Sequence, residues 1–146
     1  MKKIKTQNYL DTGEGKCILL IHGLFGALSN WEKVIKILSK NYRVIVPKLP
    51  ITKVTPSNAT IEGLTEFITK FINKKRLKNI SIIGNSLGGH LALTYAIKNQ
   101  NNIKKLILTG SSGLFENSFG ASFPKRGDYN YINERVDYTF YNPKIL

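Results

Sequence analysis

A short motif near the middle of the chain has the residue types and spacing of a nucleophilic site. Residues 84–88 read Gly-Asn-Ser-Leu-Gly, a G-x-S-x-G sequence with Ser86 at its centre. An apolar run at residues 80–83 precedes this motif, and a helical pattern begins at Ser86 and continues to residue 98. This setting predicts a nucleophile elbow, a strand–turn–helix turn so tight that its flanking positions need glycine. The Ser86 hydroxyl would then project at a helix N-terminus, where developing negative charge is favoured.

A second glycine-bearing turn lies earlier in the chain. Residues 22–26 read His-Gly-Leu-Phe-Gly and directly follow residues 17–21, Cys-Ile-Leu-Leu-Ile. A short, continuous apolar run of this kind is typical of a strand buried on both faces. We therefore place this turn at the carboxyl end of a buried strand, as we do the elbow.

Strands and helices that alternate along the chain must position these two turns. We expect strands at residues 17–21, 43–46, 80–83 and 105–108, and helices at residues 29–39, 61–72 and 86–98. This alternation predicts an α/β fold in which a parallel sheet is flanked by helices, with right-handed crossovers.

The first of these helices has a recognisable start and a recognisable apolar face. Ser29 and Glu32 are three residues apart, which predicts a capping box. The expected apolar stripe consists of Trp31, Val34, Ile35, Ile37 and Leu38, with lysines between them.

The order and spacing of these features resemble the α/β-hydrolase family. The resemblance runs from about residue 17 to residue 113 and rests on His-Gly-Leu at residues 22–24 and on Gly-Asn-Ser-Leu-Gly-Gly at residues 84–89. It implies that Ser86 is the nucleophile. It also implies an oxyanion hole made by two backbone N–H groups, those of Leu87 and of Leu24.

The residues beside these donors have two interpretations each. Leu24 and Phe25 would line an acyl pocket if the resemblance holds, and would be plain core residues otherwise. We expect His22 to be a hydrogen-bonded structural residue of its turn rather than a catalytic base.

The chain departs from the family where the general base and acid are implied. Such enzymes carry the acid and then a histidine after the nucleophile, but no histidine follows His90 in this sequence. His90 lies one helical turn after Ser86, so we expect it to pack near the sheet. Without a base, a serine hydroxyl is a poor nucleophile at neutral pH.

The acidic residues of the C-terminal region do not replace the implied pair. Asp128, Glu134 and Asp137 lie where family members carry their lid, so we expect solvated or lid roles for them. Glu116 lies near an alternative position of the acid but has no histidine to orient. We therefore expect the N-terminal portion of a hydrolase, with its catalytic Asp or Glu and His missing from this chain.

We expect one domain over residues 1–146. Its core would span about residues 17–113, and residues 114–146 would be the start of the lid or cap segment. Because such folds take about 200–250 residues as one domain, one sheet edge would be unpaired, which favours self-association or a complementing C-terminal fragment.

Composition excludes several other classes of protein. The single cysteine, Cys17, allows no disulfide framework, and with two scattered histidines it makes no zinc site of the CxxC type. We expect no metal and no cofactor. No apolar run reaches the length of a membrane span, and the basic N-terminus lacks the apolar stretch of a signal peptide. A cytoplasmic location is the expectation.

The chain is strongly basic, with 22 Lys and Arg against 9 Asp and Glu and a formal net charge of +13. This balance would suit a nucleic-acid or anionic-lipid surface. However, the one cluster, at residues 74–78, has no interleaved aromatic residues for base stacking. We therefore expect no nucleic-acid partner.

Three functional hypotheses follow from the sequence. The first is a hydrolase that cleaves a carboxylic ester, thioester or related acyl bond of a small, apolar substrate through Ser86. Similar elbows also occur in C–C bond hydrolases and acyl transferases. The second is an inactive fragment or half of a split hydrolase, and the third is a basic binding module.

Overall fold

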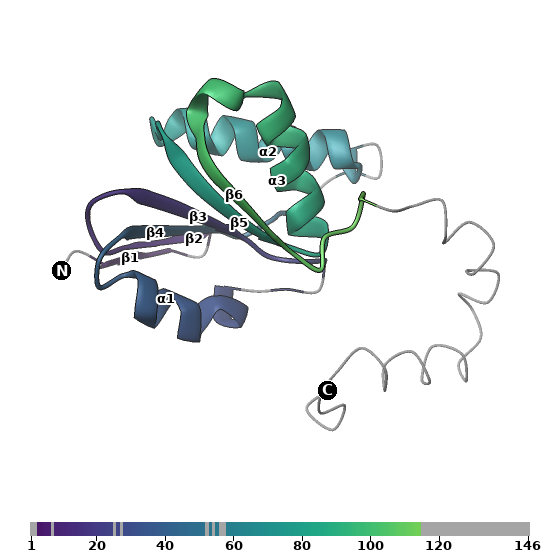
Figure 1. Ribbon diagram of the computed structural model, residues 1–146. Coiled ribbons are helices and arrows are strands. Elements are labelled where there is room, and N and C mark those ends of the chain that lie inside the picture. Colours follow the sequence, from purple (N-terminus) through teal and green to yellow (C-terminus); the bar gives the residue numbers. More distant parts are fainter. Residues whose placement is uncertain are drawn as a thin grey trace. The chain divides into compact units, whose positions relative to one another are not determined.

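The computed structural model describes residues 3–6, 8–24, 26, 28–51, 53, 55 and 58–114 (Figure 1). The unit that contains them spans Met1–Leu114, and Phe115–Leu146 is a separate unit. Apart from Leu114, the predicted lid segment lies outside the described residues, and so do its acidic residues Glu116, Asp128, Glu134 and Asp137.

The described unit contains a six-stranded mixed sheet in the order β1-β2-β4-β3-β5-β6. The strands are β1 (Lys3–Lys5), β2 (Tyr9–Thr12), β3 (Cys17–Ile21), β4 (Arg43–Pro47), β5 (Ile80–Asn85) and β6 (Ile103–Thr109). Strands β3, β4, β5 and β6 run parallel to one another. At the other end of the sheet, β2 pairs antiparallel with β4, and β1 pairs antiparallel with β2. The predicted α/β fold is confirmed, and β1 and β2 are an addition that the sequence analysis missed.

Helices cover both faces of this sheet. Helix α1 (Glu32–Leu38) lies on one face, and α2 (Ile61–Lys74) and α3 (Leu87–Lys98) lie on the other, as Figure 1 shows. Within the described part of the chain, no helix has the length and apolarity needed to cross a membrane.

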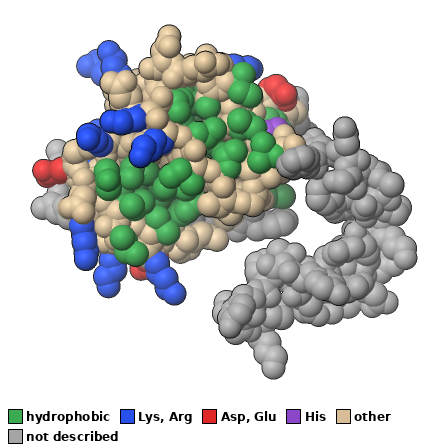
Figure 2. Space-filling model, in the orientation of Figure 1, with side chains coloured by type: hydrophobic (Ala, Val, Ile, Leu, Met, Phe, Trp, Pro, Cys, Tyr) green, Lys and Arg blue, Asp and Glu red, His purple; other side chains and the backbone are tan. Residues whose placement is uncertain are grey.

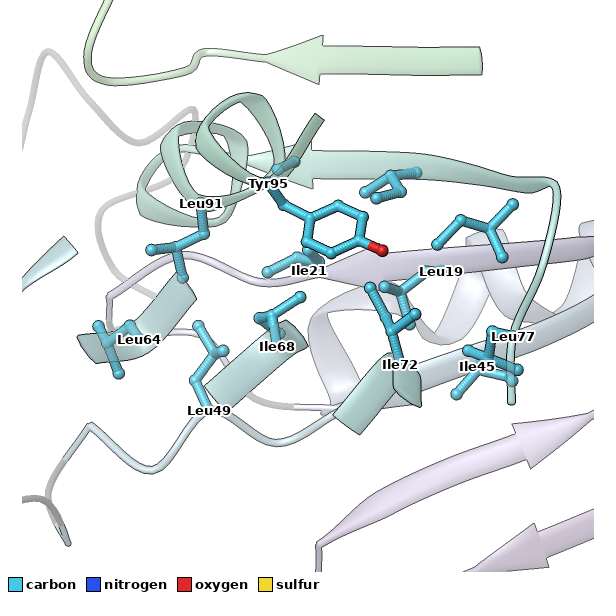
Figure 3. Packing of buried hydrophobic residues seen from close by; sticks show 13 residues of the cluster. Leu19, Ile21, Ile45, Leu49, Leu64, Ile68, Ile72, Leu77, Leu91 and Tyr95 are labelled. Carbon is cyan, nitrogen blue, oxygen red and sulfur yellow. The ribbon is translucent and has the colours of Figure 1, made fainter. Parts of the chain in front are cut away.

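The two faces of β3 contribute to two separate hydrophobic clusters, because successive side chains of a strand point to opposite faces. Leu19 and Ile21 pack with residues of α2 and α3, among them Ile68 and Tyr95 (Figure 3). Ile18 and Leu20 pack on the α1 side. The continuous apolar run at residues 17–21 is therefore explained by burial on both faces, as predicted.

Helix α2 follows the sequence prediction closely. Its buried residues are Leu64, Thr65, Ile68 and Ile72, which repeat at helical spacing. Thr60 caps its start, with the Thr60 hydroxyl oxygen accepting a hydrogen bond of 3.1 Å from Gly63 N–H.

The predicted capping box at Ser29 is wrong. Residues Leu28–Trp31 form a 3-10 helix, η1, and α1 begins only after Trp31, with no side-chain hydrogen bond at its cap. The chain enters the helix through this tighter turn, which places the Trp31 side chain in the cluster on the α1 side.

One residue of the predicted apolar stripe is also wrong. Ile37 is 66% exposed, whereas Trp31, Val34, Ile35 and Leu38 belong to or pack against the cluster on the α1 side. Val34, Ile35 and Leu38 are partly buried and follow Trp31 by three, four and seven residues, which keeps the four side chains on one helix face. Ile37, six residues after Trp31, falls outside that face.

Candidate active site

Ser86 occupies a sharp turn between β5 and α3. Its backbone has φ of 52° and ψ of −121°, in the left-handed range of φ, which costs a non-glycine residue about 1–3 kcal/mol. The residue is exposed. The structure therefore places Ser86 as the sequence predicts, raised at the carboxyl end of a buried strand and directly before a helix.

Close approaches between main chains explain the glycines on either side of Ser86. A Cβ atom added to Gly84 would lie 2.4 Å from Gly88 O, and one added to Gly88 would lie 2.2 Å from Ile21 O. Both distances are far below van der Waals contact, and both partners are backbone atoms. The turn thus requires glycine at these positions in order to bring β3, β5 and α3 together.

The end of β6 holds the elbow from the neighbouring strand. Thr109 O accepts hydrogen bonds from Ser86 N–H at 3.1 Å and from the Asn85 side-chain amide at 3.0 Å. The Thr109 hydroxyl in turn donates to Gly84 O at 3.3 Å. Sequence reasoning missed Thr109 as a supporting residue, and its one signal was its position at the end of the strand that follows the elbow helix.

The turn after β3 lies directly beside Ser86. A Cβ atom added to Gly23 would be 3.2 Å from Ser86 Cβ. Leu24, the next residue, is 47% exposed, so its side chain is not a core residue. Leu87 is half-buried and packs against the cluster on the α2 and α3 side.

The two predicted oxyanion donors thus belong to the two segments that meet at Ser86. Leu87 N–H is at the first position of α3, where N–H groups lack partners within the helix. Among the described residues, neither Leu24 N–H nor Leu87 N–H has a backbone acceptor. Phe25, the other predicted pocket residue, lies outside the described residues.

His22 is a structural residue of this turn, as predicted. It is only 2% exposed. Its Nδ1 is 2.8 Å from Gly23 O, and its Nε2 accepts a hydrogen bond of 3.0 Å from Leu49 N–H. Burial lowers the pKa of His22, and Lys48 lowers it further, against an opposing effect of the hydrogen bond with Gly23. Both ring nitrogens are therefore engaged in holding the fold.

His90 follows Ser86 by one turn of α3. Its backbone N–H lies 3.2 Å from Ser86 O. Its ring packs closely on Gly113, since a Cβ atom added there would lie 2.7 Å from three atoms of the ring. This position agrees with the packing role expected from the sequence.

The metal-binding side chains and the surface depressions of the described residues also bear on the site. No three His, Cys, Asp or Glu side chains gather there in a way that could hold a metal ion. A surface depression lined by residues 97–102 lies at the C-terminal end of α3, roughly 18 Å from Ser86 at the helical rise of 1.5 Å per residue. This depression is therefore too far from Ser86 to hold an acyl group bound to that serine.

The fold and the elbow together define a class, the α/β hydrolases. The family model described as alpha/beta hydrolase fold matches residues 16–137, and the chain belongs to that family.

Known proteins of this class resemble the chain over part of their length. A 2-hydroxy-6-oxo-6-(2'-aminophenyl)hexa-2,4-dienoic acid hydrolase of Metapseudomonas resinovorans is 37% identical over 120 residues, covering 73% of this chain and 39% of that protein. A monoacylglycerol lipase of Bos taurus is 28% identical over 108 residues, covering 70% and 32% respectively.

A solved structure shows the same relationship. An alpha/beta hydrolase enzyme from the metagenome of sediments of the Mar Chica lagoon superposes with a TM-score of 0.70 at 33% identity, covering 80% of this chain and 54% of that one. The chain spans less than half the length of the curated relatives that it matches first.

Proposed function

We propose that this chain carries the nucleophile and the oxyanion hole of a serine hydrolase that cleaves carboxylic esters, thioesters or related acyl bonds. The single observation that carries the proposal is the exposed Ser86 in a left-handed conformation, with Gly23 packed against its Cβ. Membership in the hydrolase family supports the reaction class.

In the proposed reaction, Ser86 Oγ attacks the acyl carbonyl carbon and its proton passes to a general base. The N–H groups of Leu24 and Leu87 donate to the oxygen that becomes negative. The tetrahedral intermediate collapses, and the leaving group departs with the proton. Water then hydrolyses the acyl–serine bond through the same steps.

The proposed reaction also needs a general base and an acid that orients it. His22 is engaged at both ring nitrogens, and no histidine follows His90 in the sequence. We propose that a histidine and an Asp or Glu come from a complementing C-terminal fragment. The alternative is a chain that is inactive by itself, since an oxyanion hole without a base gives only weak catalysis.

We propose a small, apolar acyl compound as the substrate. Leu24 directly follows Gly23, which lies against Ser86, and its apolar side chain is half-exposed. The similarity to a monoacylglycerol lipase favours an ester. The higher identity to the hydrolase of a 2-hydroxy-6-oxo-dienoic acid favours a second candidate, a keto acid of that kind. Parallel assays with a p-nitrophenyl ester and with a 2-hydroxy-6-oxo-dienoic acid distinguish the two.

We propose that the surface at the β6 edge binds a protein partner rather than nucleic acid. Strand β6 pairs only with β5 among the described strands, and Ile107 on it is 45% exposed. Figure 2 shows apolar side chains gathered on one face of the molecule, with Lys and Arg around them. An unpaired edge of this kind suits a complementing fragment or a second copy. A cytoplasmic location is part of this proposal.

Labelling with a fluorophosphonate probe tests the proposed nucleophile. The chain is incubated with the probe alone and after co-expression with the protein encoded directly downstream. We expect labelling that is lost in Ser86→Ala and kept in the matched variant Ser112→Ala, because Ser112 is a nearby exposed serine. Absence of labelling in both arrangements would show that the chain is an inactive fragment.

A further inference from the structure

His22 links the turn after β3 to the segment after β4 through a single ring. Leu49 N–H donates to Nε2 at 3.0 Å, so Nε2 acts as the acceptor. In a neutral imidazole the other nitrogen then carries the proton. Nδ1–H therefore donates to Gly23 O, 2.8 Å away. Burial, which lowers the pKa of His22, keeps the ring in this neutral form.

The carbonyl of Gly23 is held by a second donor from the same turn. Gly26 N–H donates to Gly23 O at 3.0 Å. Gly26 also lies against the histidine, since a Cβ atom added to it would be 2.8 Å from His22 Cβ and 3.0 Å from Nδ1. The turn therefore packs against the His22 ring. Two donors, His22 Nδ1–H and Gly26 N–H, fix the direction of the Gly23 carbonyl.

The direction of that carbonyl decides the direction of a predicted oxyanion donor. Gly23 C=O and Leu24 N–H belong to the same peptide unit, which is planar, so in the trans form they point in opposite directions. Gly23 lies against Ser86. We propose that His22 is a positioning residue, which keeps Leu24 N–H directed toward the reacting oxygen by holding the Gly23 carbonyl away from it.

This inference rests on the proposed function for its catalytic consequence, but its geometry does not depend on activity. If the donor from His22 is lost, only Gly26 N–H holds the Gly23 carbonyl. The peptide unit can then rotate and present a carbonyl oxygen where an N–H is needed. Loss of one oxyanion donor typically lowers rates by about 10²–10³-fold.

A matched pair of variants separates positioning from packing. In His22→Asn, the side-chain NH2 replaces Nδ1 and still donates to Gly23 O, but the acceptor for Leu49 is lost. In His22→Gln, the side-chain oxygen replaces Nε2 and keeps the acceptor for Leu49, but the donor to Gly23 is lost. Each variant therefore removes one of the two hydrogen bonds.

The rate of fluorophosphonate labelling is measured for both variants in the arrangement in which the wild type reacts, together with their melting temperatures. We expect His22→Gln to label about tenfold or more slowly than His22→Asn, at comparable loss of stability. Equal rates would overturn the positioning role while leaving the proposed function intact. A wild type that never labels would count against the proposed function instead.

A second measurement keeps the inference testable without any labelling. Nitrogen-15 NMR of the wild-type imidazole reports which ring nitrogen is protonated. We expect the proton on Nδ1, and amide exchange at Leu24 that changes in His22→Gln but not in His22→Asn. A proton on Nε2, or Leu24 exchange that is unchanged in both variants, would contradict the inference.

Discussion

Ser86 is held in its left-handed conformation by contacts from two neighbouring strands. Thr109 at the end of β6 accepts from its N–H, and Gly23 after β3 packs against its Cβ. These contacts offset the backbone strain at Ser86, because strained backbone angles persist where the surrounding structure determines the conformation. At the scale of single residues, the site therefore depends on close approaches as much as on hydrogen bonds.

The closest of these approaches gives a stability prediction. In Gly88→Ala, the new Cβ must be accommodated against Ile21 O and His22 O, and we expect the free energy of unfolding to fall by about 3 kcal/mol. Gly110→Ala is the control, because a Cβ atom added there would lie within 4 Å of no described atom beyond its chain neighbours. Only the positive φ of Gly110 opposes alanine, at about 1 kcal/mol. Urea unfolding measures both. A smaller loss for Gly88→Ala than for Gly110→Ala would contradict the packing described at the elbow.

The lowered pKa of His22 gives a pH prediction. Its ordinary value is 6.5 and the folded protein lowers it. The unfolded chain therefore binds more protons below pH 6.5, and stability is lost as the pH falls through this range. Above pH 6.5 the contribution is fully present.

The variant His22→Asn isolates this effect, because it removes the titrating group and leaves His90 in place. We expect the stability of the wild type relative to His22→Asn to decrease between about pH 6.5 and pH 5, by at most about 1.4 kcal/mol per pH unit. Urea unfolding across this range measures the difference. A difference that is independent of pH would show that His22 titrates normally in the folded protein.

Among the elements, strand β2 is tied to its neighbour β4 by an ion pair as well as by the antiparallel ladder. Asp11 on β2 is buried, and its carboxylate accepts from Arg43 Nε at 3.0 Å and from Arg43 Nη2 at 2.7 Å. The bidentate hydrogen bond to Asp11 raises the pKa of Arg43, against an opposing effect of burial.

Removing one partner of this pair should cost more than removing both. Arg43→Met leaves the Asp11 carboxylate without this partner, and we expect a loss of about 2 kcal/mol, reduced from the cost of a fully buried pair because the Arg43 side chain is 37% exposed. The double variant Asp11→Asn with Arg43→Met should recover part of this loss. Guanidinium unfolding of both variants measures the coupling, and purely additive losses would contradict it.

The elements that the sequence predicted are those with a strong local pattern. The apolar spacing of α2 and the continuous run of β3 were sufficient to identify them. Strand β2 was missed because its burial includes Asp11 and Thr12, and these become compatible with burial only after β4 supplies Arg43. The start of α1 was misplaced because the packing of Trp31, a tertiary effect, determines the preceding turn.

The candidate site divides in the same way. Ser86 and its glycines could be identified from the motif, because close packing at the elbow restricts the residue types. Thr109 could not, because its contact with the elbow depends on the register of β6 on β5, in which Asn85 lies opposite Thr109. The hydrogen bond between His22 and Leu49 also joins distant segments.

For the molecule as a whole, the main features are the net charge of +13 and the edge at β6, which is unpaired among the described strands. Part of the basic cluster is used within the fold, since Lys75 Nζ lies 3.7 Å from the centre of the Tyr9 ring. This contact supports a structural role for at least one cluster residue. The β6 edge has no such internal partner among the described strands.

We therefore predict that the chain self-associates through the β6 edge. Ile107 lies between Leu106 and Leu108, which pack against the cluster on the α2 and α3 side, so it faces the opposite side of the sheet. We expect Ile107→Lys to weaken self-association about tenfold or more, because a charge blunts an exposed edge. Sedimentation velocity measures this, with Ile37→Lys as the control at an exposed isoleucine of α1. Equal effects of the two variants would contradict a role of β6.

The proposed mechanism depends most on Ser86 as the nucleophile, with Leu24 and Leu87 as the oxyanion donors. A crystal structure of the chain after reaction with a fluorophosphonate, in the arrangement that gives labelling, tests this most directly. We predict phosphorus bonded to Ser86 Oγ and the phosphoryl oxygen at about 2.7–3.1 Å from both Leu24 N and Leu87 N. Phosphorus on any other residue, or a phosphoryl oxygen bound by other donors, would contradict it.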